Sequence, residues 1–209
     1  IRAAGPALAT LGVPGVLPDP RLELLSNGAV VASNDNWDGA PVLASAFNAV
    51  GAFTYAAANS KDAALFKADA ASGGYTVRVS DTAGGSGTVI AEVYDATPAA
   101  NFTATTPRLI NLAVLKQINP GSILTTGFVI SGSTGKTVLV RAIGPGLTPL
   151  GVGGALADPK LELFDNDNGG LNIGTNDNWG GTAAVSNAAA AVGRIGSGGD
   201  QARSASVDR

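Results

Sequence analysis

Residues 1–6 read IRAAGP, and residues 140–145 read VRAIGP. The correspondence continues at the same spacing, because DPRLEL at residues 19–24 matches DPKLEL at residues 158–163. Self-similarity at a fixed spacing is the sequence signature of repeated structural units. The sequence therefore predicts two copies of one unit, and the fold of the chain follows from the fold of that unit.

The rest of the unit predicts where each copy begins and ends. After a short insertion in the second copy, NDNW at residues 34–37 returns at residues 176–179. Residues 1–95 form a first copy that lacks the N-terminal strands of the unit, and residues 107–209 form a second that lacks its C-terminal strands. Residues 96–106 are uncharged and rich in Ala and Thr, which indicates a linker.

Two explanations account for these complementary truncations, and the sequence leaves both open. In the first, the 209 residues are a window on a longer tandem array. In the second, a neighbouring chain supplies the missing strands, as in donor-strand addition. Either explanation predicts self-association, with identical chains or with neighbouring repeats.

Strands are predicted wherever apolar and polar residues alternate. YTVRVS at residues 75–80 is the clearest example, and residues 21–24 and 160–163 alternate in the same way. Asn-Gly at residues 27–28 predicts a tight hairpin turn. Further strands are expected in four more apolar runs: residues 63–66, 88–94, 124–130 and 137–141.

One Ala-rich region in each copy, residues 40–51 and 182–193, breaks the strand pattern and favours a short helix. The predicted fold class is therefore all-β. It consists of two tandem antiparallel β-sandwich units of jelly-roll or Greek-key type, each incomplete and each with a short helix at one end.

Composition excludes several function classes. The chain has no Cys and no His, so it has no thiol nucleophile, no thiolate or imidazole zinc site and no Ser-His-Asp triad. Its net charge of −3 argues against nucleic acid as a partner. Its longest uncharged stretch, residues 39–60, is too weakly apolar to predict a membrane span. We therefore expect a protein that is not an enzyme.

Three short motifs support a family resemblance: LEL at residues 22–24, VVASNDN at residues 30–36 and GYTVRV at residues 74–79. Over residues 19–95 and 158–179 the chain resembles the bacterial pre-peptidase C-terminal domain family. The whole unit is similar to the Ala/Gly-rich tandem repeats of long secreted bacterial proteins. This resemblance implies a non-catalytic β-sandwich outside the cell or on the bacterial cell surface, often with bound calcium.

Polar residues are concentrated in the Asn/Asp loops. These loops offer oxygen ligands for calcium, which is the one cofactor that the sequence suggests. Ca²⁺ binds six to eight oxygens from carboxylates, amides and main-chain carbonyls. The alternative is that these residues form turns through their own side-chain hydrogen bonds, with Trp37 and Trp179 closing the ends of the sandwiches. The candidate ligands are Asn34, Asp35, Asn36, Asp38, Asp165, Asp167, Asn176, Asp177 and Asn178.

Arg2 and Arg141 stand in predicted strands, where a buried guanidinium needs a carboxylate partner. The residues that precede the LEL strands, Asp19 and Asp158, are candidates for that partner. Glu23 and its counterpart Glu162 are expected to be polar residues at strand edges, or ligands near the Asx loops.

The expected function is that of a non-catalytic extracellular structural or adhesive repeat protein, which builds a filament, stalk or surface layer. The alternative is a calcium-dependent carbohydrate- or protein-binding module of a secreted hydrolase. A hydrolase with paired carboxylates is a third hypothesis. The sequence argues against it, because the two copies share no acidic cluster beyond the Asx loops.

Overall fold

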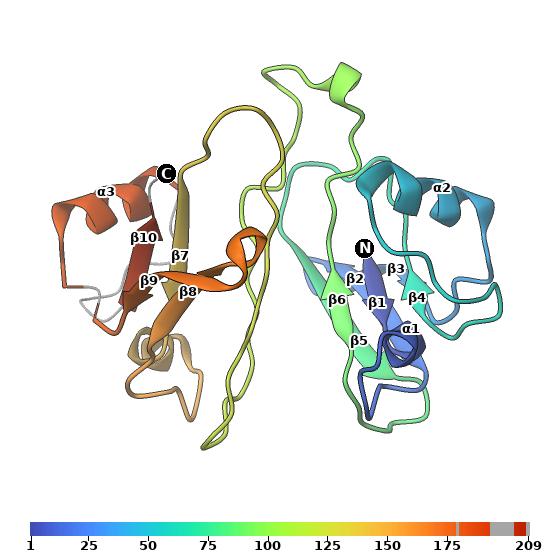
Figure 1. Ribbon diagram of the computed structural model, residues 1–209, viewed down its shortest axis with the longest axis horizontal. Helices are drawn as coiled ribbons and strands as arrows, with labels where there is room; N and C mark the ends of the chain where they lie inside the picture. Colours follow the sequence, from blue (N-terminus) through green and yellow to red (C-terminus); the bar gives the residue numbers. More distant parts are fainter. Residues whose placement is uncertain (179, 193–202, 208–209) are drawn as a thin grey trace. The chain divides into compact units, whose positions relative to one another are not determined.

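The computed structural model describes residues 1–178, 180–192 and 203–207. The chain divides into two compact units, Ile1–Leu109 (unit 1) and Ile110–Arg209 (unit 2) (Figure 1). Short antiparallel sheets and small helices make up both units, which confirms that the fold is rich in β-structure. Among the described residues, no helix has the length and apolar character needed to cross a membrane.

Unit 1 contains two three-stranded antiparallel sheets, with the strand orders β4-β1-β6 and β3-β2-β5. β1 and β2 are therefore central strands, with a hydrogen-bonded neighbour on each side. The elements are β1 (Arg2–Ala4), α1 (Pro6–Thr10), β2 (Pro20–Ser26), β3 (Ala29–Asn34), α2 (Pro41–Val50), β4 (Ala63–Ala64), β5 (Tyr75–Asp81), β6 (Ile90–Glu92) and the 3₁₀ helix η1 (Ala99–Asn101).

The turn between β2 and β3 follows from its sequence. Asn27 and Gly28 both adopt positive φ, at 49° and 79°. Two successive residues in the left-handed region give the hairpin turn that Asn-Gly prefers. The predicted turn is confirmed, and it sets the pairing in which Leu22 lies opposite Asn34.

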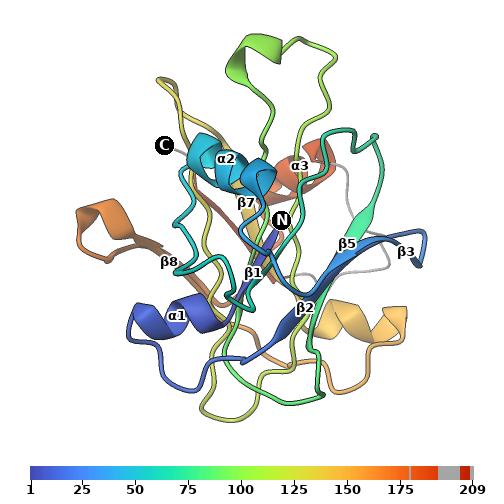
Figure 2. The same ribbon diagram turned by 90° about the vertical axis from the view of Figure 1, so that its right-hand side faces the viewer.

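The two sheets of unit 1 share a small core. Ala3 of β1, Leu22 of β2 and Ala63 of β4 are all fully buried and pack in one cluster, although they come from different sheets. A second cluster joins α1 and α2 to Trp37 and neighbouring aromatic residues. α2 lies near the N-terminal end of β1, and α1 follows the other end of that strand (Figures 1 and 2).

Unit 2 contains two two-stranded antiparallel sheets among its described residues, β10-β7 and β8-β9. Its elements are β7 (Val138–Ala142), the 3₁₀ helix η2 (Pro145–Leu150), β8 (Leu161–Asp165), the 3₁₀ helix η3 (Asn166–Asn168), β9 (Leu171–Asn176), α3 (Ala183–Ala191) and β10 (Arg203–Val207).

Gly5 and Gly144 stand at matching positions of the two units, and each lies close to a main-chain carbonyl of its own unit. Gly5 and Gly144 have φ of −117° and −114°. A Cβ on Gly5 would collide with the carbonyl oxygen of Leu17, and a Cβ on Gly144 with that of Leu156. Only glycine fits such an approach without moving the backbone.

The hairpins also match. β2 and β3 change register between Leu24 and Leu25, and β8 and β9 do so between the corresponding residues Leu163 and Phe164. A register shift of this kind bends and twists a strand pair, and it persists when a structural unit is retained. Matching sequence positions therefore adopt matching backbone conformations in the two units.

Most predicted elements form, and one is wrong. α2 and α3 confirm the predicted helices, although residue 193 lies outside the described residues. Residues 124–130 form no strand, because no described segment pairs with them. Val129 in this segment is 95 % exposed. Apolar residues favour a strand, but a strand forms only where a neighbouring strand pairs with it and its side chains are packed.

One ion pair makes the stability of unit 1 depend on pH. The Nη2 atom of Arg78 in β5 lies 2.7 Å from a carboxylate oxygen of Glu23 in β2. The hydrogen bond from Arg78 holds the pKa of Glu23 below its usual value of 4.5. A carboxyl with a lowered folded-state pKa stabilises the fold above its unfolded-state pKa, and this contribution fades as the pH falls through the folded-state value.

We therefore predict that Glu23→Gln lowers the melting temperature at neutral pH, and that the difference from wild type shrinks as the pH falls below about 4.5. Thermal unfolding followed by circular dichroism across this range measures the difference. Arg78→Gln should give the same profile, and the double variant should add little. A difference that stays constant with pH would contradict this assignment.

Candidate functional site

Among the described residues, Arg2 in β1 and Asp62 are the buried charged residues, and the guanidinium of Arg2 is the first of the two. The residue is 1 % exposed. Its central carbon lies over three aromatic rings, 4.4 Å from the centroid of Phe47, 4.2 Å from Phe53 and 4.4 Å from Tyr55. Electron-rich ring faces attract a cation, and the attraction is stronger where water is excluded. The aromatic cage therefore replaces part of the hydration that the charge loses.

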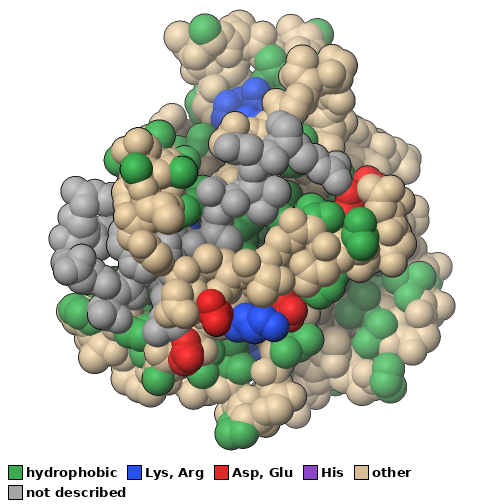
Figure 3. Space-filling model, turned by 60° about the vertical axis from the view of Figure 1, so that its left-hand side comes forward, with side chains coloured by type: hydrophobic (Ala, Val, Ile, Leu, Met, Phe, Trp, Pro, Cys, Tyr) green, Lys and Arg blue, Asp and Glu red, His purple; other side chains and the backbone are tan. Residues whose placement is uncertain are grey.

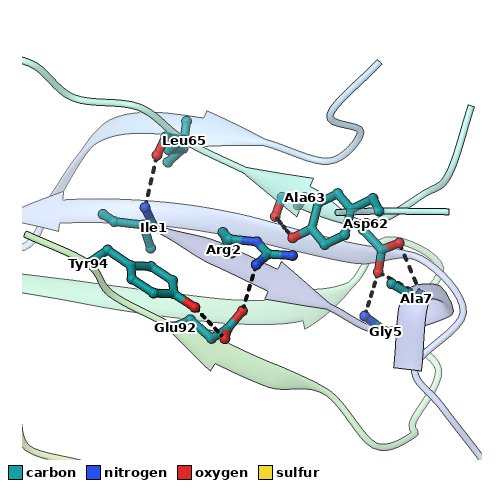
Figure 4. Close-up of polar contacts among 10 residues, drawn as sticks. Ile1, Arg2, Gly5, Ala7, Asp62, Ala63, Leu65, Glu92 and Tyr94 are labelled. Atoms are coloured by element: carbon teal, nitrogen blue, oxygen red, sulfur yellow. Dashed lines mark hydrogen bonds and ion pairs between the residues drawn. The ribbon is translucent and has the colours of Figure 1, made fainter. Parts of the chain in front are cut away.

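Glu92 of β6 supplies the opposite charge. The Nη1 atom of Arg2 lies 3.3 Å from Oε2 of Glu92, and the hydroxyl of Tyr94 donates to Oε1 at 2.8 Å (Figure 4). The expected pairing of Arg2 with Asp19 is wrong, because Asp19 pairs with Lys61 instead. Arg2 and Glu92 lie directly opposite each other in the β1–β6 ladder, so the sheet register selects the partner.

Tyr55 completes the cage as a neutral hydrogen-bond donor. Its hydroxyl donates to the carbonyl oxygen of Ala63 at 3.0 Å. Burial raises the pKa of this phenol above its usual value. The hydroxyl therefore keeps its proton, and Tyr55 ties the cage to β4.

A second buried charge, Asp62, lies at the start of α1. Its carboxylate is fully buried and accepts hydrogen bonds from the main-chain N–H groups of Gly5 at 2.8 Å and Ala7 at 3.1 Å (Figure 4). Ser60 donates to the same carboxylate. The first N–H groups of a helix have no partner within it, and a carboxylate at this end satisfies them. Asp62 therefore caps α1 from a distant part of the chain.

Hydrogen bonds join the Asn/Asp loop of unit 1, residues 34–38, to residues 62–64. The main-chain N–H of Trp37 donates to the carbonyl oxygen of Asp62 at 2.9 Å. The side chain of Asn34 accepts from the N–H of Ala64 at 3.0 Å and donates to the carbonyl of Asn36 at 2.7 Å. Both polar atoms of the Asn34 amide are thus engaged within the protein.

Trp37 is a core residue. Its side chain is 6 % exposed, and its ring packs against Phe47 and Tyr55 with centroids 5.8 Å and 5.5 Å away. The indole N–H donates to the carbonyl of Ala57 at 2.9 Å. The expectation that Trp37 closes one end of its unit fits this packing; Trp179 lies outside the described residues.

The other candidate ligands of unit 1 occupy the same loop. Asp35 and Asn36 are half-buried, whereas Asp38 is exposed and has a positive φ of 53°. Asn and Asp tolerate this conformation better than most residues do. The loop thus holds three further oxygen-bearing side chains close together in sequence.

In unit 2 the candidate ligands fall into two separate loops. Asp165 precedes η3, where its carboxylate accepts from the N–H of Asp167 at 3.1 Å and from the Asn168 amide at 2.7 Å. After β9, Asn176 donates to the carbonyl of Asn178 at 2.9 Å, as Asn34 does to Asn36 in unit 1.

The last two candidate ligands are neighbours. The amide of Asn178 donates to a carboxylate oxygen of Asp177 at 3.2 Å. Among the described residues, no three Asp, Glu, His or Cys side chains converge to hold a metal ion. That finding does not cover Asn side chains and main-chain carbonyls, so calcium at these loops stays a prediction.

A shallow apolar groove lies beside α2. It has a volume of about 270 Å³ and is lined by Val42, Ala46 and Ala49 of α2 together with Phe66 and Pro98. No charged residue lines it, so the groove offers a surface for apolar contact rather than for acid–base chemistry.

Sequence reasoning missed most of the buried cluster. Asp62 and Glu92 stand in unremarkable stretches, and only the tertiary structure brings them to α1 and to Arg2. The aromatic cage left a faint signal, because Phe47, Phe53 and Tyr55 lie close together in a chain that is only 5 % aromatic. Glu92 and the aromatic rings stabilise the buried charge of Arg2, and the N–H groups of α1 stabilise that of Asp62.

Comparison with known proteins returns no matching family model, no similar curated protein and no similar solved structure.

We predict that Asp62→Ala destabilises unit 1 by about 3 kcal/mol, because it leaves buried N–H groups of the α1 terminus without acceptors. Asp62→Asn should cost less, since the amide oxygen still accepts one hydrogen bond. Chemical denaturation measures the loss. The matched control is Asp69→Ala, whose side chain is 84 % exposed and which should change stability by less than about 0.5 kcal/mol. Equal stabilities for Asp62→Ala and the control would refute the capping role.

Proposed function

We propose that this chain is a non-catalytic extracellular structural or adhesive protein, in which repeated β-sandwich units build a filament, stalk or surface layer at the bacterial cell surface. The observation that carries the proposal is the shared backbone geometry of the two units. Gly5 and Gly144 make the same close approach, and the two hairpins shift register at the same position. A chain that repeats one compact unit can be extended without a new fold.

In this proposal each unit is an antiparallel sandwich of jelly-roll or Greek-key type. The shared core of Ala3, Leu22 and Ala63 between two sheets of unit 1 supports the sandwich. The buried charges support a structural role: Arg2 and Asp62 contact side chains and main chain of their own unit. They are held too deeply to meet a substrate.

Self-association is part of the proposal. Apolar residues with large exposed fractions support it, for example Ile110 at 86 % and Leu115 at 73 %. Within six residues, Ile110, Leu112, Val114 and Leu115 are each more than half exposed. Large exposed apolar patches are typical of regions that contact another chain. The low fraction of charged residues, 14 %, weakens electrostatic repulsion between copies.

The second candidate is a calcium-dependent carbohydrate- or protein-binding module of a secreted hydrolase. The apolar groove beside α2, with Phe66 exposed at 44 %, favours it. Trp37 gives it no support, because this indole is buried and cannot stack on a sugar. Saturable binding to a glycan array, without self-association, would favour this candidate over the first.

Electron microscopy of the purified chain tests the structural proposal. We expect linear objects with an axial repeat equal to the length of the unit. Leu22→Asp is the control, because a charge at this fully buried position should destroy the unit and the assemblies with it. Dispersed particles of single-chain size at all concentrations would refute self-assembly.

Calcium binding has its own test. If the Asn/Asp loops bind Ca²⁺, adding the ion raises the melting temperature and a chelator lowers it, because a ligand that binds only the folded state stabilises that state. Asp165→Ala should reduce the response from unit 2, whereas Asp69→Ala should leave it unchanged. A melting temperature that does not respond to calcium in the wild-type chain would contradict the calcium hypothesis.

A further inference from the structure

The segment that follows β6 folds back on itself before the chain enters unit 2. Its two ends are Asp95 and Arg108, and both belong to unit 1. The Nε atom of Arg108 lies 3.3 Å from Oδ2 of Asp95, although the 12 residues 96–107 separate them in the sequence. In both ribbon views the segment leaves the sheets of unit 1, passes through η1 and returns (Figures 1 and 2). Residues 96–106, which the sequence predicts as a linker, thus lie in a closed loop.

Arg108 also contacts the middle of this loop. The central carbon of its guanidinium lies 4.2 Å from the centroid of the Phe102 ring. The face of an aromatic ring attracts a cation at this distance. One side chain therefore joins the end of the loop both to its start, at Asp95, and to its middle, at Phe102.

Hydrogen bonds within the loop maintain its shape. The main-chain N–H of Thr103 donates to the hydroxyl of Thr106 at 2.8 Å, and this hydroxyl donates to the carbonyl of Asn101 at 3.1 Å. Among the described residues, none outside segment 95–108 forms a hydrogen bond or an ion pair with residues 98–107. Compact loops of this length, with their ends close together, are frequently functional. This loop can open without breaking polar contacts to the sheets of unit 1.

The contact that closes the loop is exposed to water. The side chain of Arg108 is 54 % exposed and that of Asp95 is 26 % exposed. Water and salt screen ion pairs at such positions, so each pair contributes little and breaks readily. Other charges that compete for the pair are few, because residues 96–107 carry none. Figure 3 shows one face of the molecule, on which charged side chains are also few among hydrophobic and uncharged polar ones.

We propose that Asp95 and Arg108 form a releasable clamp, which keeps residues 96–107 out of the connection between the two units. While the clamp is closed, the side chains at the two ends of the loop are in contact. When it opens, the chain from residue 95 to residue 108 can span at most about 45 Å. The clamp is therefore a conformational device that lengthens the connection between units without unfolding either one.

The use of this device rests on the structural role proposed above. In a tandem chain under tension, the weakest closed element extends first. Opening the clamp breaks one exposed ion pair and one ring contact, whereas unfolding unit 1 exposes two buried apolar clusters to water. Extension of the loop would thus protect the core of unit 1 from the applied force.

The first test measures the distance between the two ends of the loop. The chain has no Cys, so Ala91→Cys and Leu109→Cys create the only two labelling sites for nitroxide spin labels. Both positions are exposed. Pulsed electron paramagnetic resonance should give one narrow distribution of short distances. Arg108→Gln, which removes the ion pair and the cation–ring contact together, should broaden this distribution and shift it to longer distances.

Two further variants control for general effects of charge. Asp95→Asn removes the ion pair but keeps an acceptor for the N–H of Thr97, which lies 3.1 Å from Asp95 Oδ1. It should cause a smaller shift than Arg108→Gln, because the contact with Phe102 remains. Lys67→Gln removes the cation of an ion pair that closes no long loop, and it should leave the distances unchanged. Equal distributions for Arg108→Gln and the parent, or an equal shift in Lys67→Gln, would refute the clamp.

The second test stretches the full chain between its ends in optical tweezers. We expect a reversible extension at low force, with a gain in contour length of about 4 nm, before either unit unfolds. Arg108→Gln should lack this step, because its loop is already open, and should leave the later unfolding events unchanged. A wild-type chain that shows no extension before the units unfold would overturn the proposal.

These outcomes remain distinct from those that test the proposed function. Linear assemblies of a chain whose loop never opens would overturn the clamp alone. A clamp that opens in a chain that never assembles would overturn the filament and leave the clamp standing.

Discussion

Asp62 joins three parts of unit 1 through its carboxylate and its main-chain carbonyl. It accepts from the main chain at the start of α1, and its own carbonyl accepts from Trp37. A fully buried carboxylate is costly unless donors surround it, and here N–H groups that lack partners within α1 provide them. Because Gly5 and Asp62 are far apart in sequence, these hydrogen bonds form only when the whole unit has closed. The buried carboxylate therefore stabilises the one arrangement of β1, α1 and β4 in which these N–H groups surround it.

Arg2 uses a different solution to the same problem. Its charge is balanced by Glu92 and by an aromatic cage, so it depends on β6 and on the segment after α2. Unit 2 lacks one ring of the matching cage, because Ala189 stands at the position that corresponds to Phe47. Arg141, which corresponds to Arg2, is half-buried. A shared backbone thus supports interiors of different chemistry.

The elements that were predictable from the sequence are those whose signals lie in neighbouring residues. Asn27 and Gly28 determine a turn locally, so the hairpin was predictable. The strands with alternating residues, such as Tyr75–Asp81, formed because one of their faces is covered. Residues 124–130 are also apolar, but no described segment pairs with them, and they have no regular structure. The Asn/Asp loop was recognised as polar, but its attachment through Asn34 to Ala64 depends on a contact across the fold.

The sequence by itself predicts that one unit is present twice, because residues 1–6 correspond to residues 140–145. It also determined the local elements whose signals lie within a few neighbouring residues. Tertiary structure alone decided which charges meet: Arg2 with Glu92, Lys61 with Asp19, and Asp62 with α1. The reason is physical. A turn or a helix depends on backbone preferences of adjacent residues, whereas the partner of a buried charge depends on strand register, which brings together residues distant in the chain.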